Sequence, residues 1–374
     1  VAIVDEGIKY THPDLAANMW TNPNPSPEYN NEDIHGYNFV DEGPITWDKR
    51  ETSISGEELG DSGHGTHVAG TVAAVNNNGI GVAGVAGGTG NNDGVRLMSC
   101  QIFSGGKGGT DLIASQAIKY AADHGASILQ CSYGYSGNDI SSDRMYEERS
   151  PLEHEALLYF MNQKNCPALD GGLVFYAAGN DGLPVSQYPG AYRDFISVTS
   201  IAPDYLPAYY TCYGPGCNVA APGGETTGQS GGEKAGVLST LCSEISGADY
   251  GYMQGTSMAC PHASGVAALG LSYALANGKH YTREEFVSMY LTSVSDLECY
   301  LEGTKETGAV LNLEDYRGKM GTGLIDAYQL LMQIEGTPCL KVPTGSLQLI
   351  TLSQYFGGSA NNLTYTGIEM SKED

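Results

Sequence analysis

Three short stretches, Val4-Asp5-Glu6-Gly7, Gly63-His64-Gly65-Thr66-His67 and Gly255-Thr256-Ser257-Met258-Ala259, follow one another along the chain and decide how the rest of it is interpreted. Each supplies one member of an Asp/His/Ser set. A lone serine hydroxyl is a poor nucleophile, and it attacks a carbonyl only when a base takes its proton and a third group orients that base. Together the stretches predict a serine hydrolase whose catalytic residues are Asp5, His64 and Ser257.

Each of these residues has a local context that suits its role. Ser257 precedes a long apolar run that predicts a helix, with Pro261 expected in its first turn, and a helix N-terminus favours developing negative charge. His64 has an ordinary pKa near 6.5, which suits a general base that later acts as an acid. Asp5 ends a buried strand pattern, where an unpaired carboxylate is costly, so we expect His64 as its partner. The alternatives are that Ser257 only caps a helix and that Asp5 only caps a turn. The presence of all three residues in this order along the chain argues against both.

Longer motifs around these residues carry a family resemblance. The runs Val-Ala-Ile-Val-Asp-x-Gly, His-Gly-Thr-His-Val-Ala-Gly-Thr and Gly-Thr-Ser-Met-Ala-x-Pro-His resemble the subtilisin family of serine proteases. The order Asp, His, Ser along the chain is also the order found in that family. The resemblance covers Val1 to about Gln333 and implies a serine endopeptidase that works through an acyl-enzyme. It also implies a secreted or cell-envelope protein.

Two further stretches match binding segments of the family. The resemblance implies that the side-chain amide of Asn180 and the backbone amide of Ser257 hold the oxyanion, although Asn-Asp-Gly alone signals a turn. It also implies that an extended peptide adds as a strand between two edges, with a plain buried strand as the alternative. Asp181 and Gln187 would lie near the pocket for the residue before the scissile bond. The residues expected at the two edges are Ser132, Tyr133, Gly134, Gly108 and Gly109.

The stretch 75–82, Val-Asn-Asn-Asn-Gly-Ile-Gly-Val, resembles the calcium loop of the family. Calcium takes six to eight oxygen ligands, and such a loop offers carbonyls and amides around one acid. An uncharged turn is the alternative. We expect a structural calcium ion here and no organic cofactor, with the ligands Asp14, Val75, Asn77, Ile80 and Val82.

Apolar runs and helical patterns alternate along the chain, which predicts an α/β fold with a mostly parallel central sheet flanked by helices on both faces. Capping signals precede three of the helices, at Thr110 or Asp111, at Ser150, and at Thr282 with Glu285. Strands are expected over 1–4, 95–103, 128–132, 173–177 and 196–199. Helices are expected over 64–75, 111–124, 151–163, 257–276, 282–292 and 326–334.

The chain is expected to divide into a peptidase domain over 1–334 and a second unit over 335–374. Gly336-Thr337-Pro338 reads as a linker, and a partly alternating run after it predicts the truncated start of a β-rich C-terminal domain. Within the first domain, segments 20–61 and 135–150 are insertions expected at the rim of the cleft, where loops commonly set substrate choice.

Composition narrows the possible partners. The net charge of −25 argues against nucleic acid, which is bound by clustered Lys and Arg. No run of eighteen apolar residues exists, so no membrane span is expected. Because Val1 already stands in a strand pattern, we expect a processed fragment that lacks an N-terminal pro-segment. Nine cysteines leave at least one unpaired; Cys131 and Cys260 are expected as free buried thiols, and a Cys212–Cys217 disulfide is possible.

Two other functions fit the same fold. A catalytically silent binding module would keep the architecture without turnover, but every triad and oxyanion position is filled. A narrow processing protease or a peptide transamidase would use the two cleft insertions to restrict its substrates.

Overall fold

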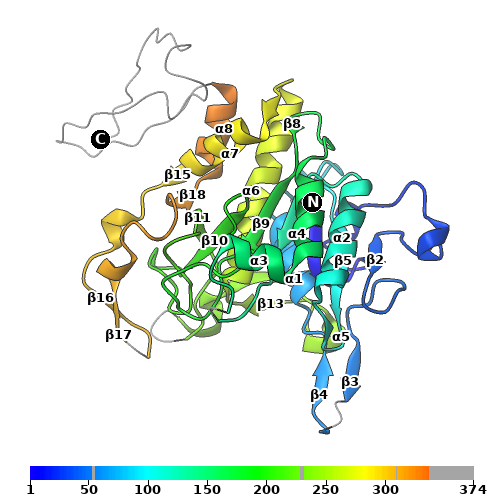
Figure 1. Ribbon diagram of the computed structural model, residues 1–374, viewed down its shortest axis with the longest axis horizontal. Helices are drawn as coiled ribbons and strands as arrows, with labels where there is room; N and C mark the ends of the chain where they lie inside the picture. Colours follow the sequence, from blue (N-terminus) through cyan, green and yellow to red (C-terminus); the bar gives the residue numbers. More distant parts are fainter. Residues whose placement is uncertain (53–54, 138, 228–230, 309, 337–374) are drawn as a thin grey trace.

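The computed structural model describes residues 1–52, 55–137, 139–227, 231–308 and 310–336. Its main element is a ten-stranded sheet (Figure 1). The strands of this sheet are β1 (Ala2–Glu6), β2 (Gly36–Asn38), β5 (Met98–Ser104), β6 (Lys107–Gly108), β7 (Ile128–Cys131), β9 (Leu173–Ala177), β10 (Ile196–Ile201), β11 (Val219–Pro222), β15 (Val294–Ser295) and β18 (Leu324–Ile325).

The strand order is β15-β18-β11-β10-β9-β7-β1-β5-β2, and β6 pairs with β5. All pairs from β18 to β2 are parallel, whereas β15 and β6 join antiparallel. The predicted mostly parallel sheet is therefore confirmed. Strand β11, which the sequence analysis missed, extends it beyond β10.

Helices cover both faces of the sheet. On β1, Ala2 and Val4 face a core shared with α2 and α4, while Ile3 faces a second core shared with α1. Figure 1 shows α2, α3 and α4 together on the near side, with α6 behind the strands. The helices are α1 (His64–Ala73), α2 (Asp111–Asp123), α3 (Asp143–Arg149), α4 (Pro151–Met161), α5 (Ser243–Ser246), α6 (Thr256–Ala276), α7 (Arg283–Thr292) and α8 (Ala327–Glu335).

The capping signals have mixed outcomes. The Thr110 side chain accepts the Ile113 N–H at the start of α2, and Thr282 with Glu285 forms a complete capping box at α7. Ser150 does occupy the position before α4, but its hydroxyl accepts no hydrogen bond from that helix. It bonds the hydroxyl of Tyr135 instead.

Helix α6 begins one residue earlier than predicted. Thr256 is its first residue, so Ser257 lies inside the first turn and Pro261 is the sixth residue, in the second turn. The expectation of Pro261 in the first turn was wrong. A proline at this place removes the N–H that would bond the carbonyl four residues earlier, which is that of Ser257.

The two insertions have defined structure. Segment 135–150 holds the unpredicted helix α3, whose Asp143 accepts hydrogen bonds from Tyr188 and Arg193. Segment 20–61 supplies edge strand β2 and a hairpin of β3 (Arg50–Thr52) and β4 (Glu58–Gly60), which projects at the bottom of Figure 1. The small pairs outside the main sheet are β8 (Leu169–Asp170) with β14 (Tyr281–Thr282), β12 (Val237–Thr240) with β13 (Tyr250–Met253), and β16 (Thr304–Glu306) with β17 (Val310–Asn312).

Other expectations can be compared with the described residues. None of the helices described is long and apolar enough to cross a membrane. Eight cysteines lie in the described part of the chain and all are free, including the buried Cys131 and Cys260 and the pair Cys212 and Cys217. The predicted second unit, 335–374, lies outside the described residues from 337 onward.

Candidate active site

The carboxyl end of β1 and the first turn of α1 bring Asp5 and His64 together. The helix can approach the strand because residue 65 is glycine: a Cβ there would stand 2.1 Å from the carbonyl oxygen of Glu6. His64 Nδ1 lies 2.8 Å from Asp5 Oδ1, which also accepts the Glu6 N–H at 2.7 Å. The buried Asp5 therefore orients the imidazole, with Nδ1 as the donor and Nε2 facing outward.

Two carboxylates influence the pKa of His64. Burial by itself would lower that pKa, but the negative charge and hydrogen bond of Asp5, with a smaller effect of Glu6, outweigh it, and the pKa is raised above 6.5. Glu6 also accepts the backbone N–H of His64 at 2.9 Å and that of Ser62 at 3.0 Å. It thereby caps α1 from outside the helix, because the residue at the cap position, Gly63, has no side chain.

Ser257 is held by Ser132, at the end of β7, through two hydrogen bonds. The Ser257 hydroxyl donates to the Ser132 carbonyl at 3.2 Å, and the Ser132 hydroxyl donates to the Ser257 carbonyl at 2.7 Å. The second bond satisfies the carbonyl that Pro261 leaves without a helical donor. Among the described residues no hydrogen bond joins Ser257 to His64, so the resting hydroxyl points to the strand and not to the base.

Asn180 and the start of α6 form a second cluster. Asn180 Oδ1 accepts both the N–H and the hydroxyl of Thr256 at 2.8 Å, which leaves the Nδ2 hydrogens as donors. A Cβ on Gly255 would lie 3.5 Å from the Ser257 nitrogen and 3.6 Å from Asn180 Nδ2. Both nitrogens therefore border one small space, together with Asn180 Oδ1 at 3.7 Å, and this space is open because residue 255, with φ of 148°, is glycine.

Two chain segments flank the carboxyl end of β1, where the substrate groove is expected. In the sheet β1 lies between β5 and β7, so the segments that follow those two strands stand on either side of Asp5. Gly108 belongs to β6 and Ser132 follows β7, as the two-edge prediction requires. The rings of Phe103 and Tyr133 meet edge-on between the two sides, with centroids 6.0 Å apart.

Asp181 and Gln187 lie together beside the Ser132 strand. Asp181 Oδ2 accepts the Gly137 N–H at 2.9 Å and also the side-chain amide of Gln187. Gln187 packs against Gly179, where a Cβ would stand 2.1 Å from Gln187 Oε1. Asp181, which follows Asn180 in the chain, thus links Gly137 to Gln187.

The predicted calcium loop closes on Asp14 through different atoms than expected. Asp14 Oδ1 accepts from the side-chain amide of Asn78 at 2.6 Å, and Oδ2 accepts the Val82 N–H at 2.9 Å. Asn77, the predicted ligand, donates to Thr89 instead. Each carboxylate oxygen of Asp14 accepts one N–H donor in this arrangement, and calcium binding stays a prediction.

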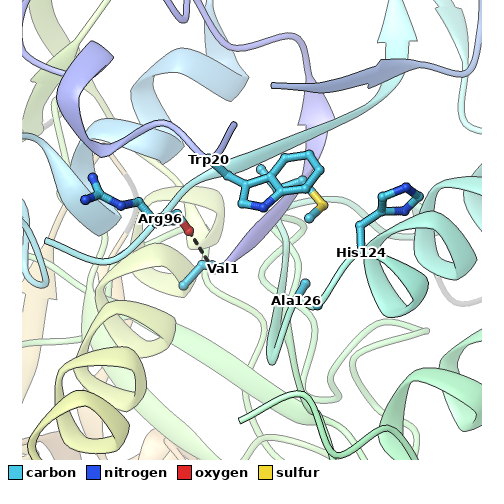
Figure 2. Close-up of a pocket in the computed structure, with 7 residues that line it drawn as sticks. Val1, Trp20, Arg96, His124 and Ala126 are labelled. Atoms are coloured by element: carbon cyan, nitrogen blue, oxygen red, sulfur yellow. Dashed lines mark hydrogen bonds between the residues drawn. The ribbon is translucent and has the colours of Figure 1, made fainter. Parts of the chain in front are cut away.

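The pocket drawn in Figure 2 lies elsewhere. It is lined by Val1, Trp20, Arg96 and His124, at the amino end of β1, whereas Asp5 is at the carboxyl end. Ligand sites of parallel sheets lie at the carboxyl ends of the strands, so this pocket is no candidate for the reaction.

Residues 1–314 match the Subtilase family. The chain belongs to the subtilase family of serine proteases. Over 269 residues this subtilase is 32% identical to the "Thermophilic serine proteinase" of Bacillus sp. (strain AK1), a match that covers 72% of the chain and 51% of the relative. It is 30% identical to the "Extracellular basic protease" of Dichelobacter nodosus, covering 87% of the chain and 49% of the relative.

Among solved structures, a protease from Pseudoalteromonas arctica matches with a TM-score of 0.64 and 28% identity over 89% of each chain. The subtilase chain spans about half the length of the first curated relatives that it matches.

Two site residues escaped the sequence analysis. Thr256 orients Asn180 and also accepts the Gly179 N–H at 3.2 Å. Glu6 caps α1 beside the base. Thr256 and Glu6 lie inside the motifs quoted above, next to Ser257 and Asp5. Their roles become visible only from the contacts that they make in the folded protein.

Proposed function

We propose that this subtilase is a serine endopeptidase that hydrolyses peptide bonds through an acyl-enzyme on Ser257. The observation that carries the proposal is that two nitrogens with N–H groups border one small space beside Ser257, on the same side of the sheet as the oriented Asp5–His64 pair. An oxyanion of a tetrahedral intermediate would accept from the Ser257 N–H and from Asn180 Nδ2.

Attack requires the Ser257 hydroxyl to leave the Ser132 carbonyl and turn toward His64 Nε2. Rotation about one side-chain bond changes its direction, and catalytic hydrogen bonds often form only once substrate is bound. His64 then takes the hydroxyl proton, and the carboxylate of Asp5 stabilises the imidazolium. The same proton passes to the leaving amine, and a water molecule repeats the steps in reverse to release the acyl group.

The substrate is proposed to bind as an extended strand between the two edges of the groove. Main-chain pairing of this kind tolerates many sequences, because it uses backbone N–H and C=O groups. At the residue before the scissile bond we propose tolerance for polar or basic side chains near Asp181 and Gln187. Asp181 is already occupied by two donors, so this preference is expected to be weak.

A narrower processing protease or a transamidase is the second candidate, and one observation favours it. Helix α3, in the insertion expected at the cleft rim, is tied to the rest of the domain by hydrogen bonds from Tyr188 and Arg193 to Asp143. A rigid rim would exclude bulky or folded substrates. We also propose an extracellular location and an N-terminal pro-segment, in line with the extracellular relative named above.

The test is a fluorophosphonate probe together with a peptide library, applied to the wild-type chain and to Ser257→Ala at neutral pH. We expect the probe to label the wild type at Ser257 and cleavage to disappear in the variant. Many cut sites would favour the endopeptidase, one or a few would favour the processing enzyme, and ligated ends would favour the transamidase. A folded wild type that neither labels nor cleaves would overturn the proposal in favour of a silent binding module.

A further inference from the structure

Glu153, on α4, is a buried carboxylate that the proposed chemistry does not use. It is 1% exposed, and four tyrosine hydroxyls surround it. Each of its oxygens accepts two of them. Oε1 accepts from Tyr133 at 2.9 Å and Tyr176 at 3.3 Å, and Oε2 accepts from Tyr146 at 3.1 Å and Tyr135 at 3.4 Å.

The four tyrosines come from three different parts of the cleft. Tyr133 and Tyr135 belong to the segment that follows β7 and is proposed to pair with substrate. Tyr146 lies on α3, in the rim insertion. Tyr176 lies on β9, four residues before Asn180. One carboxylate therefore joins the substrate-pairing edge, the rim and the strand that leads to the oxyanion donor.

Glu153 is itself fixed in place. Its backbone N–H donates to Asp111 Oδ1 at 2.8 Å, so the first turn of α4 is tied to the start of α2. Around the carboxylate, the hydroxyl oxygens of Tyr133 and Tyr176 also lie 3.1 Å apart. Each hydroxyl has one hydrogen, so either both donate to Oε1 or one of them donates to the other hydroxyl. The cluster is a connected network in which the removal of one member leaves several buried polar groups without partners.

Packing alone does not account for an acid at this position. A carboxylate buried among neutral donors costs more than an apolar side chain of similar size, and burial raises the pKa of Glu153 in accordance with that cost. An apolar core could fill the space, but it would not fix the directions of four hydroxyls. The geometry gained is the position of Tyr133, whose ring meets that of Phe103 edge-on with the centroids 6.0 Å apart.

We propose that Glu153 is a positioning residue for substrate: its carboxylate fixes the segment 132–135, which follows β7, against α3 and β9, so that this edge is ready to pair with an extended peptide. This inference rests on the proposed function. Binding energy from substrate residues remote from the scissile bond can raise kcat as well as affinity when the edge is preorganised. A loosened edge would therefore impair long substrates and leave the reactivity of Ser257 itself unchanged.

The experiment compares Glu153→Leu, which removes the acceptor that the four hydroxyls share, with Glu153→Gln, which keeps a hydrogen-bonding group of the same shape. Each variant is assayed with a hexapeptide substrate, with a single-residue amide substrate and with the fluorophosphonate probe. For Glu153→Leu we expect kcat/KM on the hexapeptide to fall about tenfold, with the other two rates within about twofold of wild type. Glu153→Gln is expected to restore hexapeptide cleavage to within about threefold of wild type.

A matched control is Asp33→Asn, another buried acid, which accepts from Asn22 at 2.6 Å and Tyr120 at 3.3 Å near the far end of α2. It should lower the melting temperature and leave the ratio of hexapeptide to single-residue rates unchanged. If Glu153→Leu does not fold, Tyr146→Phe removes one hydroxyl and should lower hexapeptide kcat/KM alone by a smaller factor.

Equal losses of rate with the two substrates and the probe would overturn the proposal. So would a lower melting temperature with no change in the ratio of the hexapeptide rate to the single-residue rate. Failure of the wild type to react with the probe would refute the proposed function instead, so the two failures can be distinguished.

Discussion

Asp5 and Glu153 are both carboxylates buried almost completely from water, yet their partners differ in kind. Asp5 faces an imidazole that can take a proton and become a cation. Glu153 faces phenols whose pKa values burial raises well above 10, so they stay neutral donors. Within the described residues, Asp5 Oδ2 has no hydrogen-bond partner, while both oxygens of Glu153 are saturated.

The difference separates two uses of a buried charge. A carboxylate that stabilises a cation formed during a reaction can be under-satisfied at rest, because its main partner appears only when His64 is protonated. A carboxylate that fixes geometry has all its partners in the resting state. Activity should therefore depend on the negative charge of residue 5. At residue 153 it should depend instead on a side chain of the same shape that still forms hydrogen bonds.

Neutralising each acid is the sharpest test and has the largest expected effect. Asp5→Asn should lower kcat about 10⁴-fold, because an amide donor there favours the wrong tautomer of His64. Glu153→Gln should change kcat for the single-residue substrate less than about twofold. Steady-state kinetics at pH 8 measures both. Similar losses in the two variants would break the distinction between a charge-stabilising and a geometry-fixing carboxylate.

The second-largest effect on kcat is expected at Asn180, because this residue stabilises negative charge that exists only during the reaction. Asn180→Ala should lower kcat about 10²- to 10³-fold with little change in KM, a magnitude taken from the subtilisin family itself. Thr256→Val, which frees the Asn180 carboxamide to turn, should have a smaller effect in the same direction. A change confined to KM in Asn180→Ala would mean that Asn180 binds the ground state and that the oxyanion has other donors.

His67 tests the cost of a buried titratable group outside the reaction. Burial lowers its pKa to about 4, and its Nδ1 has no partner within the described residues. Because the folded-state pKa is depressed, the stability that neutral His67 contributes is present above pH 6.5 and is lost as pH falls toward 4. Over this pH range the free energy of unfolding falls by about 3 kcal/mol.

The variant His67→Gln keeps a donor for the Val237 carbonyl and removes the titration. Denaturant unfolding at several pH values should show a shallower acid slope than in the wild type. His280→Gln, at an exposed histidine whose pKa is raised by the Pro167 carbonyl and Asp170, should not make the slope shallower. An unaltered slope in His67→Gln would assign the acid loss to other groups.

The sequence predicted much of this molecule and failed at identifiable points. Strand periodicity and the Asp, His and Ser motifs placed the sheet and the catalytic candidates, because those signals lie within a few adjacent residues. The Glu153 cluster has no such signature: its tyrosines are spread from residue 133 to 176 and meet only after β7, α3, α4 and β9 have packed. Nor could spacing show that Ser132 takes over the bond that Pro261 forbids.

Adjacent residues of one type are a second point that the sequence does not resolve. Asn77 and Asn78 look equivalent in the sequence, but Asn77 adopts a left-handed backbone with φ of 58°, and it is Asn78 whose side chain reaches Asp14. The chain direction in a tight turn decides which side chain faces inward, and composition alone does not fix it.

Glu6 offers a smaller test near the base. Its charge adds to that of Asp5 in raising the pKa of His64, so Glu6→Gln should lower that pKa. The acid limb of the kcat/KM profile should move to lower pH by a fraction of a unit, while kcat at pH 8 stays within about threefold of wild type. Movement to higher pH would mean that Glu6 acts through the α1 cap and not through its charge.

The smallest effect is expected at the calcium loop, where Asp14 resembles Glu153 in having both oxygens satisfied at rest. A calcium ion would have to displace the donors from Asn78 and Val82, so its net contribution should be small. We expect 10 mM calcium to raise the melting temperature measurably, by about 1 to 2 °C relative to chelator, since about 1 kcal/mol corresponds to a few degrees in a domain of this size. Asp14→Asn should abolish the rise. A rise above about 10 °C would reveal a preformed cage and contradict the hydrogen-bonded arrangement, and no rise at all would remove calcium from this loop.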